Sequence, residues 1–262
     1  MARSIKRYGF VTMRIGLIGS GNMARALAVG WAKPVTCSAL EIEQAQALAA
    51  LVGGTAVATN AEVAAASDLV LLCHKPKQLE EVAAEIADQA EVVLSILAGV
   101  GLEELRGVYP NARVYRMMPN LAAEISQATI GIVDDDAGDR ELFDRLLTLL
   151  AELGDVVAVD EADFGVLTGI SGVGPAYLAL IAQTQVEAAV AEGLDEQTAK
   201  VLVGSSLKGS SALLVSRSND SAQICREVAT PGGVTEKGLA VLAGPLREGF
   251  RAAMDAVLGR NK

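Results

Sequence analysis

The chain has 262 residues, a formal net charge of −10 and a pI of about 4.7. This length suits one large domain or two modest ones with a substantial core. The negative charge opposes binding to a nucleic-acid backbone or an anionic membrane, so we expect neither as a partner. Apolar residues make up 51% of the chain but aromatic residues only 3%, so Ala, Leu and Val must do most of the packing.

The cysteine and histidine content gives no sign of a metal site. Cys37, Cys73 and Cys225 are far apart, and the one histidine is His74. This spacing does not match known structural metal sites, so we expect no metal. An odd number of separated thiols favours a reduced, cytoplasmic protein. Residues 1–12 are basic, but no secretory apolar segment follows them, so we expect a loose extension with Met13 as an alternative start.

Short apolar runs alternate with Ala-rich helical segments as far as residue 160. Expected strands are 13–18, 35–37, 55–58, 69–73, 92–96, 114–117 and 130–133. Expected helices lie within 19–33 and at 40–51, 60–66, 78–89, 102–106 and 140–153. Asn60 is expected to cap the third of these helices. The alternation predicts an α/β domain over 13–160 with a parallel, doubly wound sheet.

The strand pattern disappears after Asp160. Long Ala- and Leu-rich helices are expected at 173–191, 195–215 and 235–258, with turns at Gly193, at Asn219 and over 231–233. We therefore expect an all-α domain over 161–262. The uncharged run 164–186 is long enough to span a bilayer. Its glycines, its polar residues and Pro175 instead favour a buried helix that begins near Pro175.

A glycine turn follows the first expected strand. Its sequence, Gly19-Ser20-Gly21-Asn22-Met23-Ala24, fits the pattern G-x-G-x-x-G/A between a strand and a helix. The first glycine makes the turn, the second admits a pyrophosphate, and the final alanine allows close helix packing. The pattern predicts a Rossmann-type domain that binds a nicotinamide dinucleotide at the helix N-terminus. The predicted contacts are Gly19, Ser20, Gly21, Asn22 and Met23.

The second expected strand should end near the adenosine ribose of the dinucleotide. The sequence there is Thr36-Cys37-Ser38-Ala39. It has no acidic residue at the strand end for the ribose of NAD, and no adjacent Arg for a 2′-phosphate. The missing acid favours NADPH, with NADH left open, and makes Ser38 and Ala39 candidate contacts.

Further short motifs lie where expected strands end or helices begin. They are Lys75-Pro76, Ser95-Ile96-Leu97-Ala98-Gly99, Met118-Pro119-Asn120, the run LTGISGVGPAY over 167–177, and VATPGGVT over 228–235. Taken together and in this order, they resemble the pyrroline-5-carboxylate reductase family. The resemblance extends from Met13 to about Arg260.

The resemblance implies a Rossmann domain that binds NADPH and a helical domain that forms a homodimer or a larger ring. The implied reaction is reduction of the cyclic imine 1-pyrroline-5-carboxylate to L-proline, with the imine bound between the two domains. The implied cofactor contacts include Asn60, Cys73, His74, Lys75, Pro76 and Ala98. The implied substrate residues are Gly232, Gly233, Val234 and Thr235 at the carboxylate and Thr168 near the imine, with Thr168 and Thr235 as the catalytic candidates.

The residues themselves leave alternatives open. A Pro-Gly-Gly turn before a helix offers N–H groups to a carboxylate, but it also occurs as a plain helix start. Thr168 either approaches the imine or bonds to its own backbone. Lys75 is a cofactor contact or a solvated loop residue. His74 titrates near neutral pH, yet without a partner we expect it to be structural rather than catalytic.

The charge pattern separates two kinds of oxidoreductase. No Lys, Arg or His occurs between Asp163 and Ala199, so the base that a hydroxyacid dehydrogenase needs is missing. A protonated imine needs only orientation and a hydride donor. Val173 replaces the serine that is usual in the family, and Ser218 and Glu227 also depart from it. Piperideine-carboxylate therefore remains an alternative substrate, and a non-catalytic NADPH-binding regulatory paralogue remains an alternative function.

Overall fold

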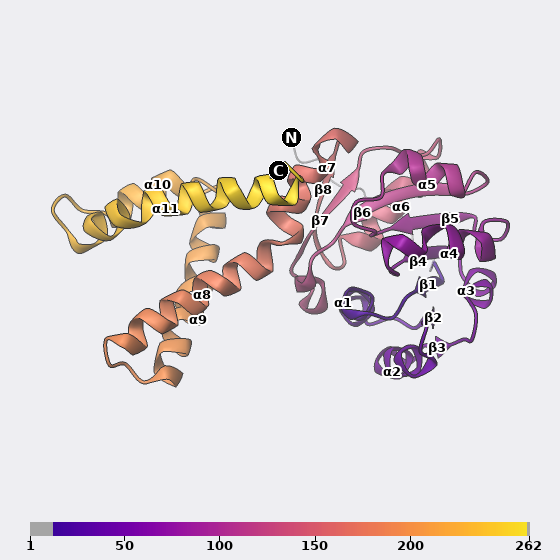
Figure 1. Ribbon diagram of the computed structural model, residues 1–262, viewed down its shortest axis with the longest axis horizontal. Coiled ribbons are helices and arrows are strands. Elements are labelled where there is room, and N and C mark those ends of the chain that lie inside the picture. Colours follow the sequence, from indigo (N-terminus) through magenta and orange to yellow (C-terminus); the bar gives the residue numbers. More distant parts are fainter. Residues whose placement is uncertain (1–12, 261–262) are drawn as a thin grey trace. The chain divides into compact units, whose positions relative to one another are not determined.

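The computed structural model describes residues 13–260, so the predicted extension 1–12 lies outside the described residues. The contacts within the chain divide it into two compact units (Figure 1). The first unit ends at Val173 and the second begins at Gly174.

The first unit contains one eight-stranded sheet in the order β3-β2-β1-β4-β5-β6-β7-β8. The strands are β1 (Ile15–Ile18), β2 (Val35–Ser38), β3 (Thr55–Ala56), β4 (Leu69–Leu72), β5 (Val92–Ser95), β6 (Arg113–Met118), β7 (Ala128–Val133) and β8 (Gly154–Val159). Strands β1 to β6 are parallel, β7 is antiparallel to β6, and β8 is parallel to β7. The order of the first six strands confirms the predicted Rossmann-type fold, and the direction changes only at β7.

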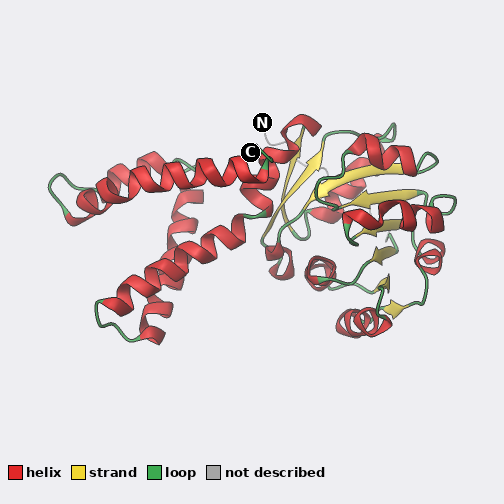
Figure 2. Ribbon diagram, in the orientation of Figure 1, coloured by secondary structure: helices red, strands yellow, loops and turns green. Residues whose placement is uncertain are grey.

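Helices cover both faces of this sheet (Figure 2). One core includes side chains from α1 (Asn22–Trp31), α2 (Ile42–Val52) and α6 (Arg140–Leu150). The other includes side chains from α3 (Asn60–Ala66), α4 (Leu79–Ile86) and α5 (Leu102–Val108). Along β4, Leu69 and Leu71 belong to the first core while Val70 and Leu72 belong to the second. This double burial explains why the central strands are continuous apolar runs.

Two local predictions were wrong. The expected helix 140–153 ends at Leu150, and the chain then forms β8, which we had not predicted. Gly154 permits the pairing, because a Cβ there would lie 2.1 Å from the carbonyl oxygen of Ala128. The expected cap of α3 was Asn60, but Thr59 caps it. The Thr59 hydroxyl accepts from the N–H of Glu62 at 3.2 Å, in a reciprocal capping box.

The segment 161–173 packs with the sheet. It consists of a 3₁₀ turn (Glu161–Asp163), α7 (Phe164–Leu167) and a π-helical turn (Thr168–Gly172). Phe164 is buried, and a Cβ on Gly131 of β7 would lie 2.1 Å from Leu167. The contacts therefore divide the chain after Val173, further along than the predicted domain boundary at Asp160.

The regular secondary structure of the second unit is all helical in its described residues, with loops between the helices (Figure 2). Its helices are α8 (Gly174–Ala191), α9 (Glu196–Ser216), α10 (Ser221–Val228) and α11 (Val234–Val257). The three long helices were predicted and the short α10 was not. Among residues 174–260, only Ala199 is buried, and many large apolar side chains are exposed. A single copy of this unit therefore has almost no hydrophobic core of its own.

Candidate functional site

The glycine turn connects β1 to α1 in a geometry that fits a pyrophosphate. Gly19 has a φ of 96°, and a Cβ there would lie 2.8 Å from the carbonyl carbon of Cys73. Gly21 comes directly before α1, and nothing lies within 4 Å of the position a Cβ would occupy. The first turn of α1 carries no acidic residue. Its first N–H groups lack partners within the helix and are available to an anion.

Ser38 holds this turn by hydrogen bonds, and Asn60 bonds to Ser38 in turn. Ser38 is buried, and its hydroxyl donates a hydrogen bond to the Oδ1 of Asn60 at 2.7 Å. The carbonyl oxygen of Ser38 accepts bonds from the N–H of Gly19 and the hydroxyl of Ser20, each at 3.0 Å. These bonds tie together the ends of β1 and β2 and the start of α3. Direct contact of Ser38 or Asn60 with a dinucleotide stays a prediction.

The loop after β2 offers little to a 2′-phosphate. No Lys or Arg occurs between Lys33 and Lys75 in the sequence. Glu41 and Glu43 are carboxylates at the start of α2. The turn therefore fits the pyrophosphate that NADPH and NADH share, while this loop adds no cation that would distinguish them.

Cys73 and His74 follow β4 and lie directly against Gly19. Burial raises the pKa of the Cys73 thiol to about 12, so it stays protonated at neutral pH and is no nucleophile. The Nδ1 of His74 donates to the carbonyl oxygen of Lys75 at 2.9 Å. Burial also lowers the pKa of His74, which keeps the ring neutral. These properties do not suit a general acid, and a cofactor contact by either residue stays a prediction.

The remaining predicted cofactor residues are in loops at the same edge of the sheet. Lys75 is exposed, and its N–H donates to the Oε1 of Gln78 at 3.1 Å. Pro76 begins a 3₁₀ turn, and Ala98 is exposed after β5. Because β1, β2, β4 and β5 are parallel, the loops at their carboxyl ends line one edge. That edge is where doubly wound sheets bind ligands.

Thr168 begins the π-helical turn at the end of the first unit. Its hydroxyl donates to the carbonyl oxygen of Phe164 at 2.9 Å. The Ser171 hydroxyl donates in the same way to Leu167 at 3.1 Å. A hydroxyl has one proton, so each oxygen is left to act as an acceptor toward a ligand. The backbone bond expected as one role of Thr168 is therefore present, and a contact of Thr168 with a substrate stays a prediction.

Asn120 was not among the residues predicted for the site. This residue is buried, and its Nδ2 donates to the carbonyl oxygen of Ser171 at 3.1 Å. The Met118-Pro119-Asn120 motif indicated only a loop after a strand. A pairing across 51 positions leaves no local pattern in the sequence.

The second unit carries the Pro-Gly-Gly turn before α11. Gly232 has a φ of 73°, and Gly233 precedes the first residue of the helix. The N–H of Gly233 donates to the carbonyl oxygen of Thr230 at 2.9 Å. The N–H of Gly232 donates to the Oε2 of Glu236 at 2.8 Å. Two of the N–H groups predicted to hold the substrate carboxylate therefore already have partners.

The start of α11 still offers other donors. Val234 and Thr235 are its first two residues, so their N–H groups have no partner within the helix. Val234 is 86% exposed, and Thr235 is partly exposed. With the Thr235 hydroxyl, this leaves a smaller carboxylate-binding set than predicted, and its role stays a prediction.

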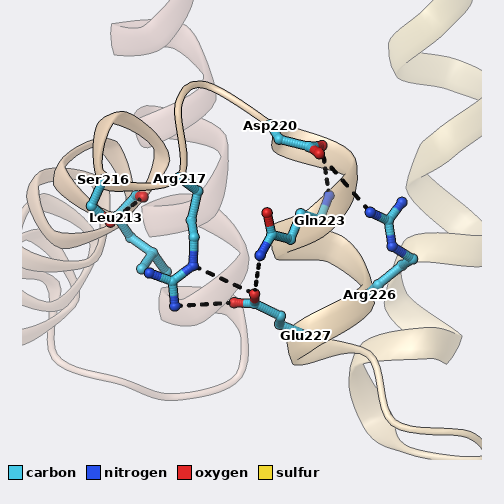
Figure 3. A network of polar contacts seen from close by, with 7 residues as sticks. All are labelled: Leu213, Ser216, Arg217, Asp220, Gln223, Arg226 and Glu227. Atoms are coloured by element: carbon cyan, nitrogen blue, oxygen red, sulfur yellow. Dashed lines mark hydrogen bonds and ion pairs between the residues drawn. The ribbon is translucent and has the colours of Figure 1, made fainter.

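A network of charged and polar groups joins α9 to α10, just before this turn (Figure 3). Glu227 accepts from the Nε2 of Gln223 at 2.7 Å and faces the guanidinium of Arg217 at 3.4 Å. Asp220 caps α10 by accepting from the N–H of Gln223 at 2.9 Å. Glu227 is thus a structural residue of the α9–α10 corner.

One helical stretch, Glu161–Ala191, is long and apolar enough to cross a membrane by length and composition alone. Only 17% of its most apolar window is buried in a single chain. Core helices of soluble proteins have the same composition, so this stretch is weak evidence for a membrane span.

Comparison with known proteins matches both parts of the chain. Residues 161–262 match the family described as pyrroline-5-carboxylate reductase dimerisation. Residues 14–99 match the family described as NADP oxidoreductase, coenzyme F420-dependent. The second match covers the glycine turn and the strands β1 to β5, where the predicted cofactor residues lie.

Proteins from several organisms are similar to this chain over nearly its whole length. The pyrroline-5-carboxylate reductase of Thermus thermophilus is 33% identical, covering 95% of this chain and 97% of the relative. That of Synechocystis sp. is 30% identical, covering 93% and 94%. The solved structure of the Coxiella burnetii enzyme superposes with a TM-score of 0.84 at 27% identity, covering 95% of this chain and 97% of that one. The resemblance predicted from the motifs is thus confirmed, and the chain belongs to the pyrroline-5-carboxylate reductase family.

Proposed function

We propose that this protein reduces 1-pyrroline-5-carboxylate to L-proline with NADPH. The observation that carries the proposal is full-length membership of the reductase family together with a glycine turn whose geometry fits a pyrophosphate. Gly19 admits the close approach of the 73–74 backbone, and Gly21 leaves space in front of the first N–H groups of α1. When bound, NADPH supplies the hydride that the imine carbon accepts.

The hydrogen-bond polarity of Thr168 supports an imine substrate that binds already protonated. Its hydroxyl proton is donated to Phe164, so its oxygen can accept from the N–H of an iminium ion. Thr168 would then orient the substrate without supplying a proton. Because the nitrogen already carries its proton, hydride addition at carbon completes the amine. The absence of Lys, Arg and His between Asp163 and Ala199 agrees with this role, and it disfavours an alcohol dehydrogenase, which needs a base.

The substrate carboxylate is assigned to the start of α11. The N–H groups of Val234 and Thr235 and the Thr235 hydroxyl are the donors that have no partner within that turn. An α-helix N-terminus favours a negative charge, even on a chain with a net charge of −10. We keep Thr168 and Thr235 as the catalytic and substrate-orienting pair, and 13–160 and 161–262 as the two functional domains.

The helical unit supports a homo-oligomer, and we propose a dimer as its smallest form. Val201, Leu202, Val241 and Leu242 are each more than half exposed in one copy. Burial of such side chains against a second copy would supply the core that the single unit lacks. The same contact would cover exposed apolar side chains of α8 such as Leu178 and Leu180. A cytoplasmic location fits the acidic chain and its three free thiols.

The test is an assay of the purified protein with five- and six-membered cyclic imino acids and with both nicotinamide cofactors. We expect NADPH oxidation that depends on 1-pyrroline-5-carboxylate. Faster turnover of piperideine-carboxylate would change the assigned substrate. NADPH binding without turnover of either imine would support the regulatory paralogue instead. Light scattering of the same sample measures the oligomer, and a monomer would contradict the proposed dimer.

A further inference from the structure

We infer that Asn120 is a positioning residue for Thr168, an inference that rests on the proposed reductase function. Asn120 follows β6 and is 6% exposed. Its Oδ1 accepts from the N–H of Ala122 at 3.2 Å. Its Nδ2 donates to the carbonyl oxygen of Ser171 at 3.1 Å. Both ends of a buried amide are thereby used, and one of them holds the π-helical turn that begins at Thr168.

The sequence itself explains why Ser171 needs this donor. In an α-helix the carbonyl of Ser171 would accept from the N–H of residue 175. That residue is Pro175, which has no N–H. The Ser171 carbonyl therefore lacks its regular helical partner, and the Asn120 amide supplies a replacement from another element. A buried carbonyl without any partner would be unfavourable, so this bond constrains where the turn can lie.

The neighbouring side chain of β6 contacts the same turn. A Cβ on Gly172 would lie 3.2 Å from the Cγ of Met118 and 3.5 Å from the Cγ2 of Thr168. Met118 and Asn120 are two residues apart, and side chains at that spacing along an extended chain point the same way. Met118 therefore restricts the turn by packing, and Asn120 restricts it by a directed hydrogen bond.

Arg116 lies two residues before Met118 at the same spacing, and it holds the start of the segment 161–173. Its guanidinium forms an ion pair with Glu161 and lies 3.8 Å from the centroid of the Phe164 ring. The other end of the segment is therefore held independently of Asn120. Loss of the Asn120 amide would release only the turn from Thr168 to Gly172, which makes the effect local.

This arrangement gives Asn120 a role in rate rather than in binding. The turn determines where the hydroxyl oxygen of Thr168 lies, because the hydroxyl and the carbonyl of Thr168 are both hydrogen-bonded within the segment 164–173. The Thr168 carbonyl accepts from the N–H of Val173 at 3.2 Å. A shift of the turn would misplace the acceptor relative to the imine nitrogen. Small misplacements of an orienting group reduce turnover more than they reduce affinity.

Asn120→Asp tests the inference, because it keeps the shape of the side chain and removes the N–H donor. We expect kcat to fall by about tenfold to a hundredfold, while the Kd of NADPH changes by less than about threefold. The matched control is Trp31→Phe, which removes another buried donor to a backbone carbonyl, that of Leu149 at 3.0 Å. The control should lower Tm and retain kcat. An Asn120→Asp enzyme with wild-type kcat, or an equal loss in Trp31→Phe, would overturn the inference.

A second measurement does not depend on turnover. Hydrogen exchange of peptides that cover 164–173 should be faster in Asn120→Asp than in the wild type and unchanged in Trp31→Phe. Unchanged exchange in Asn120→Asp would also overturn the inference. If the wild type reduces no imine, the proposed function fails while the exchange result still decides whether Asn120 holds the turn. If the wild type is active and Asn120→Asp is equally active, only the positioning role fails.

Discussion

The carboxylate of Glu236 accepts a hydrogen bond from the N–H of Gly232 at 2.8 Å. Gly232 belongs to the turn that is proposed to receive the substrate carboxylate. The protein therefore places a carboxylate of its own in the first turn of α11, where it uses one donor and adds a negative charge. A second carboxylate arriving at the same helix start would be repelled.

Glu236→Gln should therefore lower the KM for the imino acid. The glutamine oxygen can still accept from Gly232, so the turn is kept while the charge is removed. We expect a decrease of about fivefold, equivalent to about 1 kcal/mol of relieved repulsion. Steady-state kinetics at saturating NADPH measure it. Glu248→Gln, on the same helix, is the control for net charge, and an equal decrease in that variant would contradict a local effect.

Thr235→Ala should raise the KM for the imino acid and leave NADPH affinity unchanged. The substitution removes a hydroxyl donor to a charged carboxylate, a contribution of about 1.5–3 kcal/mol, or about tenfold to a hundredfold in KM. Thr235→Ser keeps the hydroxyl and should retain most of the affinity. A KM that does not change in the alanine variant would remove Thr235 from the site.

Substitutions of the two glycines of the first turn should have different effects. Gly21 has an ordinary φ of −76° and open space around the position of a Cβ, so Gly21→Ala should fold with an unchanged Tm. The added methyl would occupy the space assigned to the pyrophosphate, and the Kd of NADPH should rise by about tenfold or more. Fluorescence titration measures the Kd, and an unchanged value would place the pyrophosphate elsewhere.

Gly19→Ala should behave differently. Its φ of 96° disfavours any side chain, and the new Cβ would lie 2.8 Å from the backbone of Cys73. The fold itself should lose about 1–3 kcal/mol from backbone strain, and the contact adds to that. Thermal unfolding of both variants separates the two effects. Equal Tm losses in Gly19→Ala and Gly21→Ala would contradict the assigned geometry.

Local patterns allowed much of the fold to be predicted, and long-range partners explain what was missed. The strand before Gly19 and the helix after it are adjacent in sequence, so the motif predicted both. β8 was missed because its pairing with β7 depends on a close approach of Gly154 to Ala128, a long-range contact that leaves no local pattern. The Asn120–Ser171 bond joins residues that are 51 positions apart, and nothing near either residue indicates the other.

The local geometry of the candidate site was predicted in part for the same reason. Backbone donors of a Pro-Gly-Gly turn follow from its sequence, and both sequence and structure place them before α11. That the N–H of Gly232 is taken by Glu236 depends on a side-chain rotamer, which no motif specifies. The acceptor role proposed for Thr168 likewise depends on the hydrogen bond that its hydroxyl donates to Phe164.

Val173→Ser should increase kcat/KM on 1-pyrroline-5-carboxylate relative to the six-membered imine. Val173 is partly exposed, and its N–H bonds to the carbonyl of Thr168 at 3.2 Å, so a serine would add a hydroxyl next to the proposed imine contact. One added hydrogen bond of about 0.5–1.5 kcal/mol corresponds to roughly a twofold to tenfold gain. Competing assays with both imines measure the ratio. Val173→Ala, which removes bulk without adding a hydroxyl, separates hydrogen bonding from space. An unchanged ratio in Val173→Ser would mean that the valine is neutral packing, and an equal gain in both variants would assign the effect to the removed bulk rather than to a new hydrogen bond.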